Sequence, residues 1–432
     1  MSPIDGPALP PEIIDAIIDQ VHLLGPVSRV KDQERYHDRR DTLGACSLAS
    51  RSWLARSRFY LFETVFLPPN DFPRCNAFIA MLVHPLCTIT PYVRTLIIRE
   101  AYSLSGLGTL WLNDALPHLS LFTNVKTLSI TGARFDRMRP DAWSESGIPF
   151  FVHMKGMKQL QLLSCQFRTP DQCLDALSVC DGLEELTLRR TSLDMDLLLG
   201  LHIRLSPLPV PPPRLTKLKL DSHRLGNYDA VLRWLATTPT ITDLVLERIT
   251  DTETLAVADF VEKLGPCLEA LDLNVVDVNE ETATQDAFCR YLNLCNNTRL
   301  RSLAFDQLIL AEPYQARLTA AKHVPDIISK VSSEIKELTL RVQINSTDDL
   351  DLIDWDIIIH IVNSQRNWES LESVVVSGPR KEILAESERW MKKRLQGLKR
   401  KVNVRCTLLP TVMVGTLAFV WESPQLMRMR FS

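Results

Sequence analysis

A short leucine-rich pattern recurs along most of the chain and limits what the chain can fold into more than any other feature. The pattern reads apolar-x-x-apolar-x-apolar, and its copies begin at Val93, Val125, Met157, Leu183, Leu215, Ile241, Leu268, Leu300, Ile335 and Leu371. Successive copies start 26 to 36 residues apart. One copy means little because leucine is common, whereas ten at a similar spacing indicate a repeat protein whose units pack on their neighbours.

Each copy has the features of a strand, and helix signals lie between copies. The last two apolar residues of a copy alternate with a polar one, which is strand periodicity. Residues 169–172 (Thr-Pro-Asp-Gln) predict a helix N-cap, an N1 proline and a capping-box partner. Residues 250–253 are expected to cap a further helix that Gly265 ends, and Asn227 another. The unit is therefore a strand followed by a helix.

A strand–helix unit of this period resembles the leucine-rich repeat family, over about residues 90 to 380. The resemblance implies a solenoid with parallel strands on its concave side and helices on its convex side. The family usually has Asn or Cys three residues after the last leucine of the motif. Those positions hold Ala101, Ala133, Cys165, Thr191, His223, Ile249, Val276 and Leu308. Only Cys165 keeps the consensus, so an irregular solenoid with variable helices is expected.

Two segments interrupt the repeats. Residues 207–213 (PLPVPPP) can be a polyproline ligand for an aromatic groove or a stiff loop between repeats. Residues 134–150 are rich in Arg, Asp, Trp and Gly, and they are predicted to form a long surface loop.

Before the repeats, two segments have helical patterns. Ile13, Ile14, Ile17 and Ile18 form one wide apolar stripe in a helix that begins near Pro11. Residues 43–62 carry a second, mostly helical apolar pattern.

These two segments together resemble the F-box, the helical module of ubiquitin-ligase substrate receptors, as found in large fungal families. The matching residues are Leu9, Pro10, Glu12, Ile13, Ile17 and Ile18, followed by Cys46, Ser47, Leu48, Arg51 and Trp53. The family's F-box packs on a Skp1-like adaptor, which joins it to a cullin. Carried over by position, the adaptor-binding residues are Leu9, Pro10, Ile13, Ile17, Leu48 and Trp53. Glu12 is expected to favour the first helical turn instead.

An insertion separates this chain from the usual F-box pattern. Residues 25–40 lie between the two helical segments, and their mixed charges predict a solvated loop or a short exposed helix. Loop-closure entropy grows slowly with length, so the insertion is tolerable for folding, although it can obstruct the adaptor. The competing interpretation is that the N-terminal helices only cap the end of the solenoid.

The predicted fold class is thus α/β: an N-terminal helical F-box-like module followed by an irregular leucine-rich repeat solenoid. The expected domains are the module at 1–67, the solenoid at 68–405 and a C-terminal capping segment at 406–432. Residues 408–421 form an apolar run of 14 residues with Pro410 and Gly415, which is too short for a membrane span and predicts a closing strand pair.

Bulk properties argue against several classes of function. The net charge of −3 argues against a nucleic-acid partner. The N-terminus has no signal-peptide features, and none of the ten cysteines forms a CxxC pair, which predicts reduced thiols in a cytoplasmic and/or nuclear protein without a membrane partner. Residues 106–108 lack the third glycine of a dinucleotide site. The acidic run at 348–356 lacks the glycine of a calcium loop and predicts the start of a helix that ends near Asn363. No enzyme activity, metal or cofactor is expected.

Charged residues at the third, fifth and seventh motif positions are expected to point away from the core, on the concave face. They are Arg189, Lys217, Lys219, Asp221, Asp243, Glu247, Asp272 and Asp306. Their order predicts a bipolar surface, basic and then acidic, that binds a target of complementary charge, although solvated strand faces would carry the same residues. The expected function is a substrate-recognition subunit of an SCF-type cullin–RING ubiquitin ligase with an unknown target. The alternative is a leucine-rich repeat scaffold without a ligase role.

Overall fold

A computed structural model describes residues 10–23, 33–67, 72–100, 111–193, 208–221, 228–247, 249, 253–274, 288, 290–310, 319–378, 381–399 and 401–408. By its contacts the chain divides into two compact units, with residues 1–131 and 139–158 in the first unit and residues 132–138 and 159–432 in the second. Leu9, Asn227 and residues 250–252, which the sequence analysis singled out, lie outside the described residues.

The described residues form an α/β protein with a twelve-stranded open sheet, in which the strands follow one another in chain order. The strands are β1 (Thr64–Leu67), β2 (Thr95–Arg99), β3 (Thr127–Thr131), β4 (Gln159–Leu163), β5 (Glu185–Arg189), β6 (Lys217–Asp221), β7 (Asp243–Glu247), β8 (Ala270–Asn274), β9 (Ser302–Ile309), β10 (Glu337–Gln343), β11 (Ser373–Gly378) and β12 (Asn403–Leu408). Every neighbouring pair with a described register is parallel. This open parallel sheet is compatible with the predicted solenoid.

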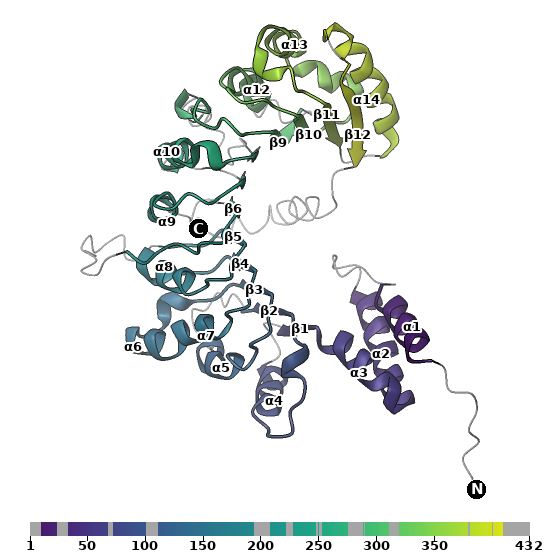
Figure 1. Ribbon diagram of the computed structural model, residues 1–432, viewed down its shortest axis with the longest axis vertical. Helices are drawn as coiled ribbons and strands as arrows, with labels where there is room; N and C mark the ends of the chain where they lie inside the picture. Colours follow the sequence, from purple (N-terminus) through teal and green to yellow (C-terminus); the bar gives the residue numbers. More distant parts are fainter. Residues whose placement is uncertain are drawn as a thin grey trace, which may run out of the picture. The chain divides into compact units, whose positions relative to one another are not determined.

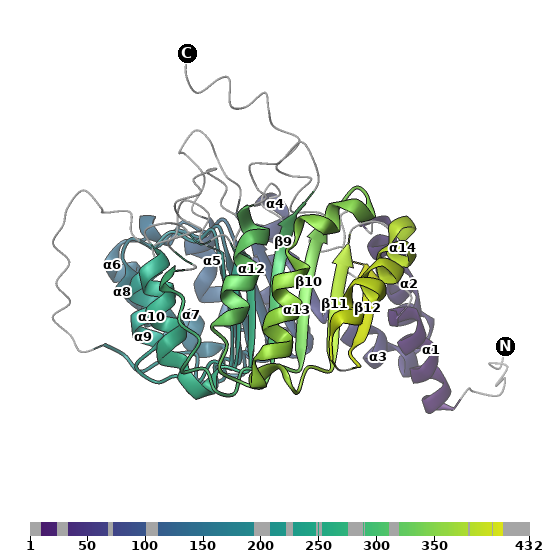
Figure 2. The ribbon, with the colours of Figure 1, turned by 90° about the horizontal axis from the view of Figure 1, so that it is seen from above.

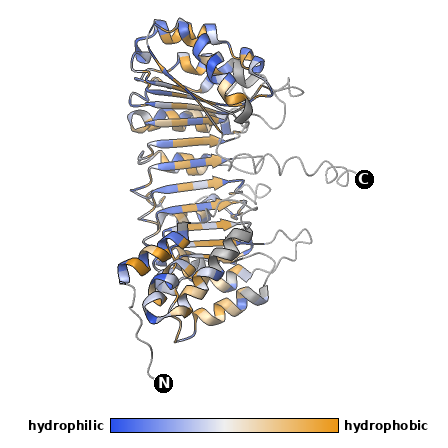
Figure 3. Cartoon of the chain, turned by 90° about the vertical axis from the view of Figure 1, so that its right-hand side faces the viewer, coloured by the Kyte–Doolittle hydropathy of each residue, from blue (hydrophilic) through white to orange (hydrophobic). Residues whose placement is uncertain are grey.

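The leucine-rich motif sets where each strand begins. All ten predicted copies are strands, β2 to β11, and each strand starts two residues after the first residue of its motif. That first residue is buried in every copy, as at Val93 and Leu183. The next two apolar positions are buried as well, so three side chains of each repeat enter the core. Figure 3 shows the resulting alternation of hydrophilic and hydrophobic bands along the strands.

Helices connect the strands. The longer ones are α1 (Pro11–Leu23), α2 (Gln33–Ala49), α3 (Arg51–Phe62), α4 (Phe72–Leu82), α5 (Trp111–Leu119), α7 (Ile148–His153), α8 (Pro170–Ser178), α9 (Asp229–Leu235), α10 (Thr254–Leu264), α12 (Thr319–Ser329), α13 (Trp355–Ser364) and α14 (Lys381–Arg394). Within the second unit, α8, α9, α10, α12 and α13 lie on one side of the strands (Figures 1 and 2). The opposite side of that unit carries no α-helix of the described residues, so the strand side chains there form an open face.

Helix caps follow the sequence in part. Thr169 accepts a hydrogen bond from the Gln172 amide at 3.3 Å, as predicted, while the Gln172 side chain accepts from the Arg168 amide instead of closing a capping box. Gly265 ends α10 with φ of 48°. Glu253 does not cap α10, because its carboxylate accepts from the Tyr228 amide at 3.1 Å.

The acidic run starts helices through its own side chains. Asp349 forms a capping box with Ser346 in front of a 3₁₀ turn at Thr347–Leu352. Asp354 caps α13, which ends at Ser364, one residue beyond the predicted end.

A threonine takes over the turn contacts that the absent asparagines would make. Thr191 is fully buried, and its hydroxyl donates to the carbonyl of Leu162 at 2.8 Å, which links one repeat to the previous one. Its amide donates to the Tyr228 hydroxyl at 3.2 Å, which in turn donates to the Asp221 carbonyl at 3.1 Å. In this repeat a threonine and a tyrosine therefore satisfy buried backbone groups.

The proline-rich segment acts as a stiff loop. The Trp234 indole donates to the Pro209 carbonyl at 2.5 Å, and Pro211 and Pro212 are buried. A polyproline ligand must expose its prolines to an aromatic groove, so these contacts favour the loop interpretation.

The predicted surface loop at 134–150 is wrong, because this segment is mostly helical and partly core. It contains a 3₁₀ turn at Phe135–Arg137, a short helix α6 (Pro140–Ala142), a π-helical turn at Trp143–Gly147 and the start of α7. Phe135, Trp143 and Phe150 are buried. The abundance of Arg, Asp and Gly suggested solvent exposure, but the aromatic residues decide the outcome because each buries a large apolar area.

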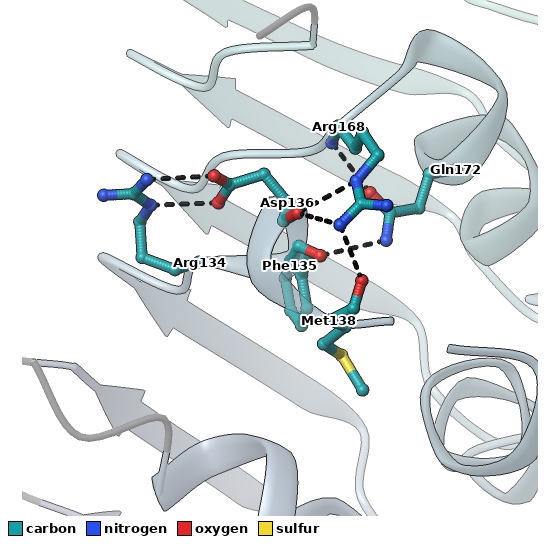
Figure 4. Close-up of polar contacts among 6 residues, drawn as sticks. All are labelled: Arg134, Phe135, Asp136, Met138, Arg168 and Gln172. Atoms are coloured by element: carbon teal, nitrogen blue, oxygen red, sulfur yellow. Dashed lines mark hydrogen bonds and ion pairs between the residues drawn. The ribbon is translucent and has the colours of Figure 1, made fainter. Parts of the chain in front are cut away.

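Arg168 holds the first part of that segment in place. Its guanidinium donates to the carbonyls of Asp136 (3.0 and 2.8 Å) and Met138 (3.1 Å), and Gln172 donates to the carbonyl of Phe135 at 3.1 Å (Figure 4). The Asp136 carboxylate accepts two bonds from Arg134, both at 2.9 Å. These side chains hydrogen-bond to the carbonyls of Phe135, Asp136 and Met138 in this turn.

Two glycines give a matched test of packing. A Cβ at Gly147 would lie 2.3 Å from Cε3 of Trp143, whereas a Cβ at Gly44 in α2 would meet nothing within 4 Å. We expect Gly147→Ala to lower the free energy of unfolding by about 2 kcal/mol, because the buried indole must move. Gly44→Ala is expected to raise it by about 0.5–1 kcal/mol through lower backbone entropy of the unfolded chain. Urea denaturation of both variants measures this, and equal effects would contradict the π-turn packing.

Candidate functional site

The N-terminal module is a three-helix unit with a small core. Ile14 and Ile18 of α1 and Leu43 of α2 are buried together, and Trp53, Tyr60 and Leu61 of α3 pack against them. Among the described residues of the module these three apolar side chains are the fully buried ones, which is few, so other apolar side chains remain exposed.

The apolar stripe of α1 divides between two faces. Ile14 and Ile18 point into the core, while Ile13 is 49% exposed and Ile17 is 38% exposed. These two isoleucines are four residues apart and therefore neighbours on the helix surface. Leu48, near the end of α2, is 87% exposed, and Pro10 is exposed as well. Of the six predicted adaptor-binding residues, four are thus accessible, and Leu9 lies outside the described residues.

Trp53 does not belong to the exposed group. It is partly buried and packs on the core of Ile14, Ile18 and Leu43. An indole is the largest apolar side chain available to this small module, so the helices use it for their own packing. Trp53 therefore contributes to the packing of the module, and its place in a docking face stays a prediction.

Residues 33–40 of the predicted insertion are helical. They form the first half of α2, which ends at Ala49, and Ser50 has an extended conformation (φ −161°, ψ 165°) that separates α2 from α3. The predicted helical pattern of 43–62 is therefore two helices, and the insertion lengthens one of them. The remaining residues of the insertion lie outside the described residues.

A polar network fixes α1 against α3. Arg56 donates to both carboxylate oxygens of Asp19, at 2.7 and 2.8 Å, and the Tyr60 hydroxyl donates to the same carboxylate at 2.9 Å. The His22 ring stacks on the Tyr60 ring at 4.0 Å. The two bonds from Arg56 hold the pKa of Asp19 below its ordinary value, and burial is the main reason why the pKa of Tyr60 is raised. This bidentate pair orients the exposed isoleucines of α1.

The Asp19–Arg56 pair makes the attachment of α1 sensitive to pH. A carboxyl whose pKa is lowered on folding adds stability that is fully present above its unfolded value of 3.8 and is lost as pH falls through the lower folded value. We expect Arg56→Met to destabilise the protein at pH 7 by less than about 1 kcal/mol, because both groups are partly solvated. Chemical denaturation at a series of pH values should show this difference shrinking below pH 3.8. A difference independent of pH would show that the carboxylate does not contribute.

The predicted target-binding residues lie on β5 to β9, and four of the eight pair with one another. Arg189 donates to Asp221 at 2.9 Å, and Lys219 lies 2.5 Å from Glu247. The Arg341 guanidinium binds Asp272 on β8. Arg341 reaches past β9 because Ala304, which pairs with Asp272, is small. The predicted separation into a basic and an acidic surface is therefore corrected to interstrand ion pairs that cancel charge locally.

Three of the predicted target-binding carboxylates are buried. Asp221, Glu247 and Asp306 are buried, so their side chains are not exposed to a target protein. Asp221 and Glu247 are the last residues of β6 and β7, and Asp306 lies within β9. Lys217 is the most exposed of the set, 3.3 Å from Glu185, and Asp243 is partly exposed, with a hydrogen bond from Thr242 at 2.6 Å.

The sequence contained a signal for these pairs that the prediction did not use. Parallel strands in register bring equal motif positions side by side, as the pairings of Glu185 with Lys217 and Arg189 with Asp221 show. Aligning the motifs and comparing charges between successive copies would have predicted both pairs. Arg341 had no such signal, because its partner lies two strands away.

Among the described residues, no cluster of three or more His, Cys, Asp or Glu side chains could hold a metal. Within the same residues, the helices are all too short or too polar to traverse a lipid bilayer. The fold and these surfaces define an α/β repeat protein with an open parallel sheet and an N-terminal three-helix module. No protein-family model matches the chain, and no curated protein matches it.

Proposed function

We propose that this protein is the substrate-recognition subunit of an SCF-type cullin–RING ubiquitin ligase. Its N-terminal module would act as an F-box and bind a Skp1-like adaptor, and its leucine-rich repeats would hold a target protein. The chain itself would do no chemistry. It would keep the target near a ubiquitin-carrying enzyme and so raise the effective concentration of the reacting groups.

The observation that carries this proposal is the exposure of Ile13, Ile17 and Leu48 on a module with a minimal core. Exposed apolar side chains on a rigid helix are typical of a surface that another protein covers. The bidentate Asp19–Arg56 pair supports the same view, because it fixes the helix that presents the isoleucines.

The competing role of the module, a cap for the first strand, accounts for only part of it. The chain passes from α3 through Glu63 into β1, and the Glu63 carbonyl accepts from the amides of Arg94 and Thr95 at 2.8 and 2.9 Å. These contacts join α3 to the strands of the first unit. These contacts do not involve the outward face of α1 with Ile13 and Ile17, which is the face that an adaptor would bind.

The direct test is binding of the full chain to a purified Skp1-like adaptor, measured by isothermal titration calorimetry. A one-to-one complex of micromolar or tighter affinity is the expected result. If the folded chain does not bind an adaptor that binds an established F-box protein in the same buffer, the ligase role fails. The chain would then be a leucine-rich repeat scaffold.

A further inference from the structure

Positive charge is concentrated near the last strand of the sheet. Residues 389–405 contain eight basic residues and no acidic one, in a chain whose net charge is −3. Seven of the eight are described, and all seven are exposed: Arg389, Lys392, Lys393, Arg394, Lys399, Lys401 and Arg405. We call these seven residues the terminal basic cluster. The proposed ligase role uses none of them.

The terminal basic cluster lies on well-packed structure. Three apolar side chains between its members are buried: Met391, Leu395 and Leu398. The Asn363 side chain of α13 donates to the Gly397 carbonyl at 2.8 Å and accepts from the Lys399 amide at 2.9 Å, which fixes the turn after α14. α14 itself packs on β12 (Figure 1). The backbone that presents the basic side chains is therefore held in place.

For most of the cluster the described residues offer no counter-charge. Lys392 lies 2.5 Å from Glu388, and Arg394 lies 3.0 Å from Asp356. The other five members form no ion pair with any residue that the structure describes. Basic residues four positions apart on α14, such as Arg389 and its neighbour in the next turn, repel each other. Binding of an anion would relieve this repulsion.

The helix macrodipole explains only part of the cluster. Basic side chains in the last turn of a helix interact favourably with its C-terminus, which accounts for the three that close α14. This effect is limited to the last turn. Arg389 lies before that turn, and three further members follow the helix, from Lys399 to Arg405. The cluster therefore extends beyond what the stability of α14 requires.

Exposed carboxylates next to the cluster indicate which kind of anion fits it. Asp356 contacts Arg394, and the 3₁₀ turn Thr347–Leu352, which carries the exposed Asp348 and Asp351, packs on α14. A lipid surface or a nucleic-acid duplex is broad and anionic throughout, so it would meet these carboxylates as well as the basic residues. An extended acidic peptide is narrow enough to follow the basic residues alone.

We propose that the terminal basic cluster binds an extended segment of a partner protein that is rich in Asp and Glu. Successive carboxylates of that segment would pair with the basic side chains of α14 and of the residues that lead into β12, since one exposed ion pair alone contributes little. The proposal does not depend on the ligase role, because the cluster lies in the second unit and the exposed isoleucines of α1 lie in the first. Adaptor binding and peptide binding can therefore fail separately.

Binding of an acidic peptide to the full chain tests the proposal. The probe is a labelled peptide of about ten alternating Glu and Asp residues, which spans roughly 33 Å when extended. Fluorescence anisotropy is expected to give a dissociation constant of about 100 µM or tighter at about 0.05 M salt, and a weaker one at about 0.2 M, because salt screens exposed charges. Absence of binding at the lower salt concentration would overturn the proposal.

A matched pair of triple variants separates the cluster from the net charge of the chain. Lys393→Glu with Lys399→Glu and Lys401→Glu is expected to weaken peptide binding by at least about tenfold. The control variant makes the same change in net charge at exposed positions elsewhere, and its affinity should stay within about twofold of the unchanged chain: Lys155→Glu, Arg214→Glu and Lys263→Glu. Equal losses in the two variants would overturn the proposal.

The charge reversals should leave the fold intact. Lys393→Glu turns the repulsion from Arg389 into an attraction, so the temperature of thermal unfolding should be no lower. Lys399→Ala with Lys401→Ala, outside the helix, repeats the test with a smaller expected loss of affinity.

Two further probes address the other classes of anion: a DNA duplex of random sequence and vesicles of phosphatidylserine and phosphatidylcholine. We expect both to bind the full chain more weakly than the peptide does in the same buffer. Tighter binding of either probe, lost in the triple variant of the cluster, would assign the cluster to that class of partner and contradict the proposal.

Discussion

Ile17→Asp is expected to weaken binding of the Skp1-like adaptor by about 30-fold, and the double change with Ile13→Asp by more than about 100-fold. A central apolar anchor in an interface contributes about 2 kcal/mol or more, which corresponds to that factor. A charge at the same place must also be desolvated when the partner covers it. Both side chains are substantially exposed in the free chain, so the fold should tolerate the change. Calorimetric titration measures the affinity, and thermal unfolding measures the stability.

A matched control separates this effect from a general loss of apolar surface. Leu255 of α10 is 60% exposed and lies in the second unit, far along the chain from α1. Leu255→Asp should bind the adaptor as the unchanged chain does. A second comparison is Ile18→Asp, which is expected to unfold the module because Ile18 is fully buried. If Ile13→Asp/Ile17→Asp binds the adaptor as tightly as the unchanged chain does, α1 is not part of the interface. The main support for an F-box role is then lost.

The repeat architecture could be predicted because the motif indicates both where each strand begins and which of its residues align with the neighbouring strand. In every copy the same three apolar positions are buried, so counting residues from the motif gives the start of each strand. β1 was missed because Phe62, Val65 and Leu67 fit the motif but follow directly on a helical pattern that ends at Phe62. β12 was missed because Lys401 stands at the first motif position. Both strands depend on pairing with a neighbour, which a single segment of sequence does not reveal.

Helical periodicity predicted which residues of α1 are apolar neighbours, but not which of them are buried. The positions of Ile13, Ile14, Ile17 and Ile18 give one wide stripe, and only the packing of α1 against α2 and α3 decides that Ile14 and Ile18 are buried. Trp53 was assigned to the docking face by resemblance, and periodicity did not indicate that it also packs, partly buried, against this small core. On the open face of the sheet, single residues suggested free charges. The interactions between strands, which depend on register and on small residues such as Ala304, turned them into pairs.

Arg189→Met is expected to lower the free energy of unfolding by about 2–3 kcal/mol, the largest effect of any charged residue on the open face. Its partner Asp221 is fully buried at the end of β6, and the 2.9 Å bond from Arg189 neutralises its carboxylate. Replacement of Arg189 takes a counter-ion from a buried carboxylate, and breaking a buried ion pair usually costs about 3–5 kcal/mol. The Arg189 side chain is 29% exposed, so water already weakens this ion pair. We therefore expect a loss of about 2–3 kcal/mol instead of the usual 3–5 kcal/mol.

Lys217→Met provides the control on the same face. Lys217 and Glu185 join the same two strands as Arg189 and Asp221, but their side chains are 55% and 39% exposed. Loss of this pair should change stability by less than about 1 kcal/mol. Guanidinium denaturation of Arg189→Met, Asp221→Leu and the double variant gives a double-mutant cycle. The double variant should lose less free energy of unfolding than the sum of the two single losses. Additive effects, or equal losses in Arg189→Met and Lys217→Met, would show that the buried pair of Arg189 and Asp221 stabilises the fold no more than an exposed pair does. The ion pairs of the open face would then be ordinary surface contacts, available to exchange partners when a target binds.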